Sequence, residues 1–237
     1  MEVYWLEQNV SSVAAGDAWL SETERVRLAQ LRIPKRLSDW RLGRWTVKCA
    51  LSSYWGLARD FQHLAELELR PMPSGAPMVF FRGSPVRLAL SLSHSGDRGL
   101  CAIGPEAVAI GCDLEIIEER NPAFMADFFT EDEQNLAAET PFVYRDRLVT
   151  LLWSAKESAL KALGCGLRAD TRSVNAVPDS FPEGTSAKWN PLSVACGGGK
   201  TFRGWWSKSG SLVRTLVAEP APRRIIALRP PGIHLAA

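Results

Sequence analysis

Hydrophobic and polar residues along this chain follow helical spacing in three segments. Thr23–Leu31 has this spacing, and a longer segment, Arg36–Leu51, combines it with a basic side. Phe142–Leu163 predicts a third helix, which the glycine at 164 or 166 would terminate. We therefore expect two long helices, one in each half of the chain.

Shorter segments show the alternation and turn signals of β-strands. The pattern predicts strands at Met78–Arg82, Leu88–Leu92, Gly99–Ile103, Val108–Ile117, Ser193–Ala195, Thr201–Ser207 and Leu212–Ala218. Residues 36–104 and 142–218 therefore have a similar order of elements, a long helix followed by short strands, although no residue-level repeat is evident. The proline-rich end, Pro220–Pro231, predicts an extended tail or a final edge strand.

Composition narrows the class of protein. The 237 residues are 46% hydrophobic and 23% charged, which suits a folded core, and the net charge of +2 is far from that of a typical nucleic-acid binder. The amino-terminal residues lack the apolar run of a signal peptide, and no segment has the length of a membrane span. The five cysteines are scattered without metal-binding or disulfide spacing. We expect a soluble, cytoplasmic protein that binds neither nucleic acid nor membranes.

The most informative strand segment is Ile110–Ile117, because it carries Asp113 and Glu115 two residues apart. Alternate residues of a strand project from the same face, so the two carboxylates would repel each other unless a cation lay nearby. Mg²⁺ takes hard oxygen ligands of this kind together with substrate phosphates. Alone, such a pair is more often simply solvated.

The third predicted helix carries a second informative segment. Glu157 and Lys161 stand one turn apart on it, with Trp153 and Leu160 on the side available for burial. An exposed ion pair is an equally good explanation for the helix alone. Together with Asp113, however, Glu157 supplies a further carboxylate and Lys161 supplies a cation for a phosphate.

These two segments, Gly111-Cys-Asp-Leu-Glu115 and Trp153-Ser-Ala-Lys-Glu-Ser-Ala-Leu-Lys161, resemble the two-part signature of the phosphopantetheinyl transferase superfamily. Further matches to the Sfp-like branch are Leu92-Ser-His-Ser-Gly96, Phe128-Phe-Thr-Glu-Asp-Glu133 and Gly43-Arg44. Two departures stand out. Cys112 replaces the usual valine or isoleucine, and Ala76 replaces a lysine that often contacts phosphate in this family.

The resemblance implies an α+β fold of two similar subdomains that are related by a pseudo-twofold axis, with the active site in the cleft between them. We expect an N-terminal subdomain at 1–105 that contacts coenzyme A phosphates, and a C-terminal subdomain at 106–220 that carries the metal and catalytic residues. A proline-rich tail would follow at 221–237. A chain of this length would supply both halves itself and act as a monomer.

The resemblance also implies roles for individual residues. The metal ligands, for Mg²⁺ or Mn²⁺, would be Asp113, Glu115 and Glu157. The catalytic residues would be Glu157, Lys161 and Glu133, with either glutamate as the base. The contacts to coenzyme A would come from Lys35, Arg36, Arg44, Lys48, Ser93, His94 and Lys156. A solvated basic face is the alternative for the helical cations among them.

The implied activity is Mg²⁺-dependent transfer of 4′-phosphopantetheine from coenzyme A to a serine of an acyl or peptidyl carrier protein, with release of 3′,5′-ADP. Two alternatives remain open, namely a non-catalytic homologue that binds coenzyme A or a carrier, and a metal-dependent phosphohydrolase. For the carrier itself, we hypothesise that Phe124 and Met125 form its docking surface while Phe128 and Phe129 pack inward. The alternative places all four in the core.

Overall fold

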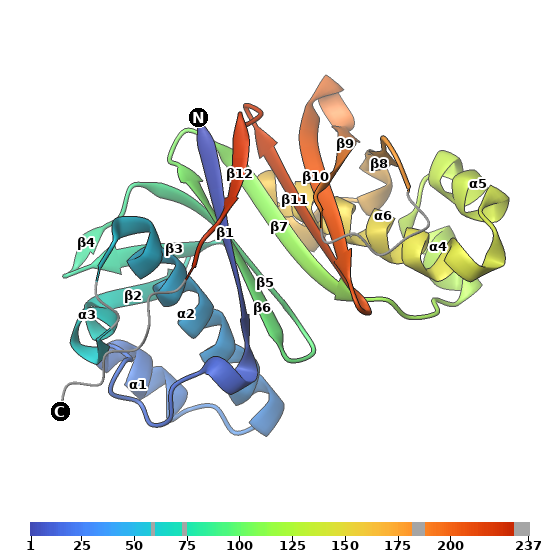
Figure 1. Cartoon of the computed structure of the whole chain (residues 1–237). Helices are drawn as coiled ribbons and strands as arrows, with labels where there is room; N and C mark the ends of the chain where they lie inside the picture. Colours follow the sequence, from blue (N-terminus) through green and yellow to red (C-terminus); the bar gives the residue numbers. More distant parts are fainter. Residues whose placement is uncertain (58–59, 73–74, 182–187, 230–237) are drawn as a thin grey trace. The chain divides into compact units, whose positions relative to one another are not determined.

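The computed structural model describes residues 1–57, 60–72, 75–181 and 188–229 of the chain (Figure 1). It divides into two compact units. Unit 1 consists of residues 1–107 and 223–237, and unit 2 consists of residues 108–222. Both combine helices with predominantly antiparallel sheets, so the α+β fold class is confirmed. The pseudo-twofold relation between the units stays a prediction.

The described residues of unit 1 form two sheets and three α-helices. Its strands are β1 (Glu2–Asn9), β2 (Leu67–Pro71), β3 (Pro77–Phe81), β4 (Ser84–Pro85), β5 (Leu88–Ser95), β6 (Arg98–Pro105) and β12 (Arg224–Ala227), and its helices are α1 (Glu22–Leu28), α2 (Pro34–Trp55) and α3 (Phe61–Glu66). One sheet has the order β12-β1-β6-β5, and the other has the order β2-β3-β4. Helix α2 packs on β6, β1 and β5 and buries Trp45 and Leu51 completely.

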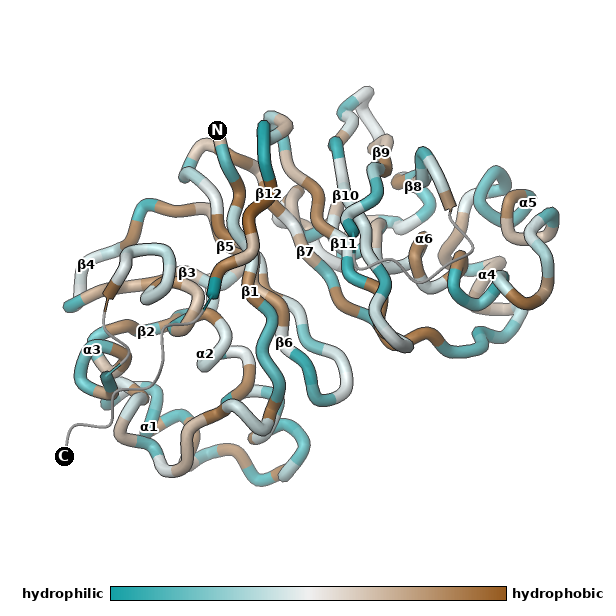
Figure 2. Tube along the Cα trace, viewed as in Figure 1, coloured by the Kyte–Doolittle hydropathy of each residue, from teal (hydrophilic) through white to brown (hydrophobic). Residues whose placement is uncertain are grey.

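Unit 2 contains one five-stranded sheet. Its strands are β7 (Ala109–Ile116), β8 (Val174–Pro178), β9 (Asn190–Cys196), β10 (Thr201–Ser209) and β11 (Leu212–Glu219), and its helices are α4 (Pro122–Phe128), α5 (Glu131–Glu139) and α6 (Phe142–Ala162). The order is β7-β11-β10-β9-β8, with every neighbouring pair antiparallel. Helix α6 lies along β7 and β11. Figure 2 shows hydrophobic stretches along β7 and β11. The sheet side of this core comes from β8, β9, β10 and β11, with buried residues that include Val194, Phe202 and Val213.

Short 3₁₀ turns complete the described chain. They are η1 (Val10–Ser12), η2 (Gly166–Arg168), η3 (Thr171–Ser173) and η4 (Gly197–Gly199). None of the described helices is both long and apolar enough to cross a lipid bilayer.

The two long helices and the seven strands that the sequence predicts are all present, with shifted ends. In the described part of the proline-rich end, Arg224–Ala227 forms the predicted edge strand, since β12 lies at the edge of its sheet and pairs in parallel with β1, Glu2 lying opposite Arg224. Sequence patterns did not predict β1, β2, β4, β8, α3 or α5. Strand β1 pairs with β6 and β12, which are distant in sequence, and the others are short.

The two units repeat one order of elements. In unit 1, β1 is followed by α1, α2 and the hairpin β2–β3, and then by the pair β5–β6. In unit 2, β7 is followed by α5, α6 and the hairpin β8–β9, and then by the pair β10–β11. The first strand also pairs with the last strand of its series in both units, β1 with β6 and β7 with β11.

The repeat extends to helix caps. Helix α1 begins with a capping box in which Ser21 and Glu24 exchange side-chain and backbone hydrogen bonds, and α5 begins with the same device formed by Thr130 and Glu133. Each box satisfies amide groups that would otherwise lack partners at the start of a helix. The two boxes also place a glutamate next to the long helix of each unit.

Candidate functional site

The acidic residues of unit 2 are placed by close packing between β7 and α6. Gly111 lies in β7 so near α6 that a Cβ atom built on it would be 1.8 Å from the carbonyl oxygen of Ser158. Only glycine permits this approach. Ser158 and Ser154 of α6 also share hydrogen bonds with the buried hydroxyl of Thr215 in β11, at 2.7 and 2.9 Å. The strand and the helix are thereby held in one register.

Asp113 and Lys161 form the centre of this site. Lys161 Nζ lies 2.7 Å from Asp113 Oδ1 and also donates to the carbonyl oxygen of Cys112 at 3.2 Å. The Asp113 side chain is 4% exposed and that of Lys161 is 26% exposed. Burial acts to lower the pKa of Lys161, but the Asp113 carboxylate outweighs it, so the pKa is raised. Lys161 therefore stays a cation with one side open to solvent.

Glu115 lies next to this pair on β7. Trp153 Nε1 donates to Glu115 Oε1 at 3.2 Å, and a terminal nitrogen of Arg120 lies 3.8 Å from Oε2. Burial and the charge of Asp113 raise the pKa of Glu115 to about 7, against the weaker opposite effects of Arg120 and Trp153. This carboxyl group is thus poised between its neutral and charged forms near neutral pH.

Glu157 completes the set from α6. Burial and then the charge of Asp113 raise its pKa, while Lys161 opposes this shift. The pKa values of Glu115 and Glu157 therefore both depend on Asp113, so the three carboxylates act on one another electrostatically. A group with this excess of negative charge gains stability from an added cation.

The donor chemistry fits a hard divalent cation, since all three groups offer carboxylate oxygens. In the described part of the chain, however, no three side chains of the types that bind metals are already arranged around one point. To bind a shared ion, the three carboxylates would have to turn toward it. Asp113 would also have to give up part of its ion pair with Lys161.

Glu133 and Lys156 have a different role from the one the sequence predicts. Lys156 Nζ lies 2.5 Å from Glu133 Oε2 and donates to the carbonyl oxygen of Val174 at 2.6 Å, and both side chains are buried. Glu133 Oε1 accepts from the amide of Ala176 at 2.8 Å. This pair ties α5 to α6 and to β8. These contacts describe a structural ion pair and do not support the predictions of a catalytic Glu133 and a coenzyme A-binding Lys156.

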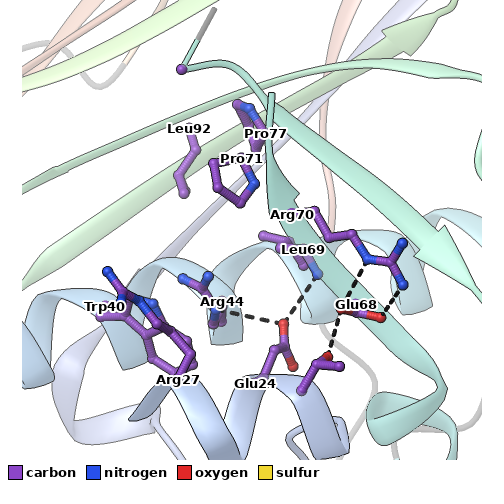
Figure 3. A pocket seen from close by; sticks show the side chains of 12 residues that line it. Glu24, Arg27, Trp40, Arg44, Glu68, Leu69, Arg70, Pro71, Pro77 and Leu92 are labelled. Carbon is purple, nitrogen blue, oxygen red and sulfur yellow. Dashed lines mark hydrogen bonds and ion pairs between the residues drawn. The ribbon is translucent and has the colours of Figure 1, made fainter. Parts of the chain in front are cut away.

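Unit 1 contains a pocket of about 510 Å³ on the side of α2 that carries Arg44 (Figure 3). Its lining includes Thr23, Glu24, Arg27, Trp40, Arg44, Glu68, Leu69, Arg70, Pro71, Gly75, Pro77 and Leu92. The Arg44 guanidinium lies 3.5 Å from the centre of the Trp40 ring, and its Nε lies 3.5 Å from Glu24 Oε1. Arg70 is oriented by Glu68, with hydrogen bonds of 2.9 and 2.8 Å. Three arginines and an aromatic plane thus line one cavity, a combination suited to an anionic, planar ligand.

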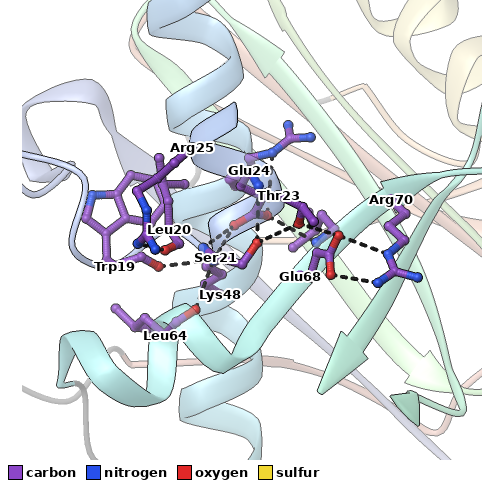
Figure 4. A network of polar contacts seen from close by, with 12 residues as sticks. Trp19, Leu20, Ser21, Thr23, Glu24, Arg25, Lys48, Leu64, Glu68 and Arg70 are labelled. Atoms are coloured by element: carbon purple, nitrogen blue, oxygen red, sulfur yellow. Dashed lines mark hydrogen bonds and ion pairs between the residues drawn. The ribbon is translucent and has the colours of Figure 1, made fainter. Parts of the chain in front are cut away.

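Lys48 does not take part in this pocket. Its ammonium is completely buried and lies 2.6 Å from Glu24 Oε2, and it donates to the carbonyl oxygens of Trp19 at 3.0 Å and Leu64 at 2.9 Å (Figure 4). Burial lowers its pKa, and Glu24 opposes that shift. All three ammonium protons have partners within the fold, so the prediction that Lys48 contacts coenzyme A is corrected.

The remaining predicted contacts lie outside the described lining of the pocket. Lys35 is 77% exposed and pairs with Asp39 at 2.7 Å, and Arg36 is exposed near the start of α2. Ser93 and His94 follow the lining residue Leu92 on β5, Ser93 buried and His94 exposed. Of the seven predicted contacts to coenzyme A, only Arg44 lines this pocket.

The aromatic residues of α4 lie against Trp153. Phe129 is buried, and Phe124 and Phe128 pack partly buried around the Trp153 ring, at 5.0 and 5.4 Å between ring centres. Met125 is also partly buried against this cluster. All four residues contribute to the core, so the docking hypothesis for Phe124 and Met125 loses its clearest support.

Sequence reasoning missed Glu24, Arg27 and Arg70. A signal for Glu24 exists, because Trp45-Thr-Val-Lys48 in α2 repeats Trp153-Ser-Ala-Lys156 in α6. Aligning these motifs would have suggested a glutamate in front of α2 as the counterpart of Glu133. Arg27 and Arg70 have no such signal, since only the folded chain brings α1 and β2 to one cavity.

Comparisons with known proteins agree on one family. Residues 109–202 match the model of the 4′-phosphopantetheinyl transferase superfamily. The chain is 28% identical to the 4′-phosphopantetheinyl transferase HetI of Nostoc sp. (strain PCC 7120) over 164 residues, which cover 68% of this chain and 67% of that protein. It is 33% identical to a holo-[acyl-carrier-protein] synthase of Campylobacter curvus over 81 residues, which cover 34% and 66%.

Among solved structures, a holo-(acyl-carrier-protein) synthase from Bacillus anthracis in complex with CoA (3′,5′-ADP) matches with a TM-score of 0.36 and 20% identity. The match covers 43% of this chain and 91% of that chain. The family relationship rests on the sequence matches. Residues 109–202 include the three carboxylates Asp113, Glu115 and Glu157 and also Lys161.

Proposed function

We propose that this chain, whose residues 109–202 match the model of the 4′-phosphopantetheinyl transferase superfamily, is a transferase of that family and moves 4′-phosphopantetheine from coenzyme A to a serine of an acyl or peptidyl carrier protein. The other product would be 3′,5′-ADP. We further propose that a single chain acts as a monomer of the Sfp-like branch.

One observation carries this proposal, namely the Asp113–Lys161 pair flanked by Glu115 and Glu157. Its position within the matched residues supports the family's chemistry at this point of the chain. Asp113, Glu115 and Glu157 would hold Mg²⁺. A bound Mg²⁺ would neutralise the oxygens of the pyrophosphate and stabilise the charge that develops on the leaving group.

Lys161 has the charge and the partial exposure to contact a phosphate oxygen. It would stabilise negative charge on the transferred group during in-line attack by the carrier serine. Glu157, whose pKa is raised, would accept the serine proton. Glu133 is no longer a candidate for this step, because its two oxygens are already bonded to Lys156 and to the amides of Thr130 and Ala176.

The pocket of unit 1 would bind the nucleotide part of coenzyme A. Arg44 would contact a phosphate, and Trp40 would present an apolar plane beside it. Arg27 and Arg70, which line this cavity, would supply positive charge where Ala76 leaves out the lysine that is usual in the family.

Chromatography of the nucleotide products tests the proposal against its alternatives. The protein is incubated with coenzyme A and Mg²⁺, with and without an apo-carrier. Release of 3′,5′-ADP that requires the carrier supports transfer. Release without the carrier indicates a phosphohydrolase, and binding of coenzyme A without any release indicates a non-catalytic homologue. Either of the last two results would contradict the proposal.

A further inference from the structure

Glu24 makes contacts with two cations of different roles. Its Oε2 accepts from Lys48 Nζ at 2.6 Å and from the amide of Ser21 at 3.1 Å. Its Oε1 accepts from the amide of Leu69 at 3.1 Å and lies 3.5 Å from Arg44 Nε. Glu24 is 3% exposed and still lines the pocket. One carboxylate thus joins the interior of unit 1 to the arginine beside the cavity.

Among the described residues of unit 2, its counterpart Glu133 has no second cation beside it. Glu133 bonds to Lys156, to the amide of Thr130 and to the amide of Ala176, which repeats the contacts of Glu24 with Lys48, Ser21 and Leu69. Arg44 precedes Lys48 by four residues, and the residue four before Lys156 is the buried Leu152. In unit 2, contacts with one lysine and two backbone amides are therefore sufficient to hold the capping-box glutamate in place. The contact of Glu24 with Arg44 is an addition found in unit 1.

Arg44 is constrained on two sides. Trp40 covers the face of its guanidinium at 3.5 Å, and Glu24 Oε1 lies 3.5 Å from its Nε, an ion pair that is longer than a hydrogen bond. A guanidinium can pair with one anion through Nε and with another through its terminal nitrogens, since it is a rigid planar fork. Burial lowers the pKa of Arg44 to about 10, and Glu24 opposes this shift. Glu24 therefore helps keep Arg44 charged in a half-buried setting.

We propose that Glu24 is a positioning residue that fixes Arg44 through Nε, so that the terminal nitrogens of Arg44 are presented to a phosphate monoester bound in the pocket. The ligand class is a ribonucleotide with a phosphate on its ribose, here coenzyme A with its 3′-phosphate. The inference rests on the proposed function of this pocket. Glu24 would touch no substrate and would act through Arg44.

Calorimetric binding of coenzyme A and of 3′-dephospho-coenzyme A tests this role. The variants are Glu24→Gln, Arg44→Ala, the double variant, and Glu133→Gln as the matched control. Glu24→Gln should weaken binding of coenzyme A by about fivefold, as the loss of one half-buried ion pair to Arg44 predicts, and leave 3′-dephospho-coenzyme A unaffected. In the Arg44→Ala background the same change should have no further effect.

Glu133→Gln should lower the melting temperature as Glu24→Gln does, yet keep the wild-type preference for coenzyme A over 3′-dephospho-coenzyme A. Should Glu24→Gln also keep that preference, Glu24 is purely structural and the inference is overturned. A wild type without any preference for coenzyme A would instead contradict the proposed ligand of the pocket, and the inference with it.

Arg44→Lys provides a test that does not depend on the folding of any Glu24 variant. Lysine keeps the charge but has neither a planar face for Trp40 nor an Nε for Glu24. The preference for the 3′-phosphate should therefore fall to the level of Arg44→Ala. If Arg44→Lys binds both ligands as the wild type does, a positive charge alone is sufficient to recognise the 3′-phosphate. The positioning role of Glu24 is then disproved.

Discussion

Lys48 of α2 and Lys156 of α6 hold equivalent positions, each with its ammonium against a capping-box glutamate. The distances are 2.6 Å to Glu24 and 2.5 Å to Glu133. The residue after Lys48 is Cys49, whereas the residue after Lys156 is Glu157. The two units therefore share a structural lysine, and only unit 2 adds the adjacent carboxylate to it.

Lys156→Met should destabilise the protein by about 3–5 kcal/mol, because it leaves the buried Glu133 carboxylate without its cation. Urea denaturation measures the loss. Lys35→Met is the matched control, since its ion pair with Asp39 is largely exposed on the lysine side and should change stability by less than about 1 kcal/mol. Similar effects of both variants would contradict a structural role for Lys156.

Gly111→Ala should cost at least about 3 kcal/mol, because its methyl group would collide with the backbone of α6 and push β7 away. It should also reduce activity by displacing Asp113. Gly197→Ala serves as the control, since a Cβ there meets its nearest neighbour only at 3.8 Å. Thermal melting of both variants measures the loss of stability. An equally small decrease in melting temperature at both positions would refute the tight contact between β7 and α6.

Sequence patterns predicted the long helices and the central strands because their hydrophobic periods are sustained over many residues. Asp113, Glu115, Glu157 and Lys161 were found from their spacing in two short motifs, and the structure brings Asp113 and Lys161 into direct contact. The motif alone does not separate catalytic from structural charge. Lys156 lies beside Glu157 in the same motif, and only its burial distinguishes the two roles.

The cations of α2 also show that a local sequence pattern does not determine the role of a charged residue. Lys35, Arg44 and Lys48 are all cations of this helix, but they end in solvent, beside a pocket and in the core, respectively. What separates them is the packing of α1 and β2 over one side of the helix. These contacts join residues far apart in sequence, so no local pattern contains them.

Glu115 should make the metal-free protein less stable as pH rises. Its folded pKa of about 7 lies above the ordinary value of 4.5, so the stability it contributes is fully present below pH 4.5 and is lost as pH rises through 7. The charged groups that act on it are Asp113, Glu157 and Arg120. Glu115→Gln should therefore stabilise the protein by about 1 kcal/mol or more at pH 8 in chelator, and by much less at pH 5. Melting curves at both pH values check this, and a pH-independent difference would exclude it.

Asp113→Asn should lower kcat by at least about a hundredfold, since it removes the carboxylate shared by Lys161 and the proposed metal site. Asp170→Asn is a control in the same unit, because Asp170 is exposed and pairs with Arg172 on the surface. It should retain wild-type turnover. Steady-state kinetics with a carrier substrate measures both, and an active, folded Asp113→Asn enzyme would remove Asp113 from the mechanism.

The central claim is that this chain attaches phosphopantetheine to a carrier serine, and intact-mass spectrometry of the carrier tests it most directly. Several apo-carriers from fatty acid, polyketide and nonribosomal peptide synthesis are incubated with the protein, coenzyme A and Mg²⁺. We predict that at least one gains the mass of a single phosphopantetheine group, and that its serine-to-alanine variant and reactions with Asp113→Asn show no gain. Unchanged carrier masses with a folded protein that binds coenzyme A would contradict the account.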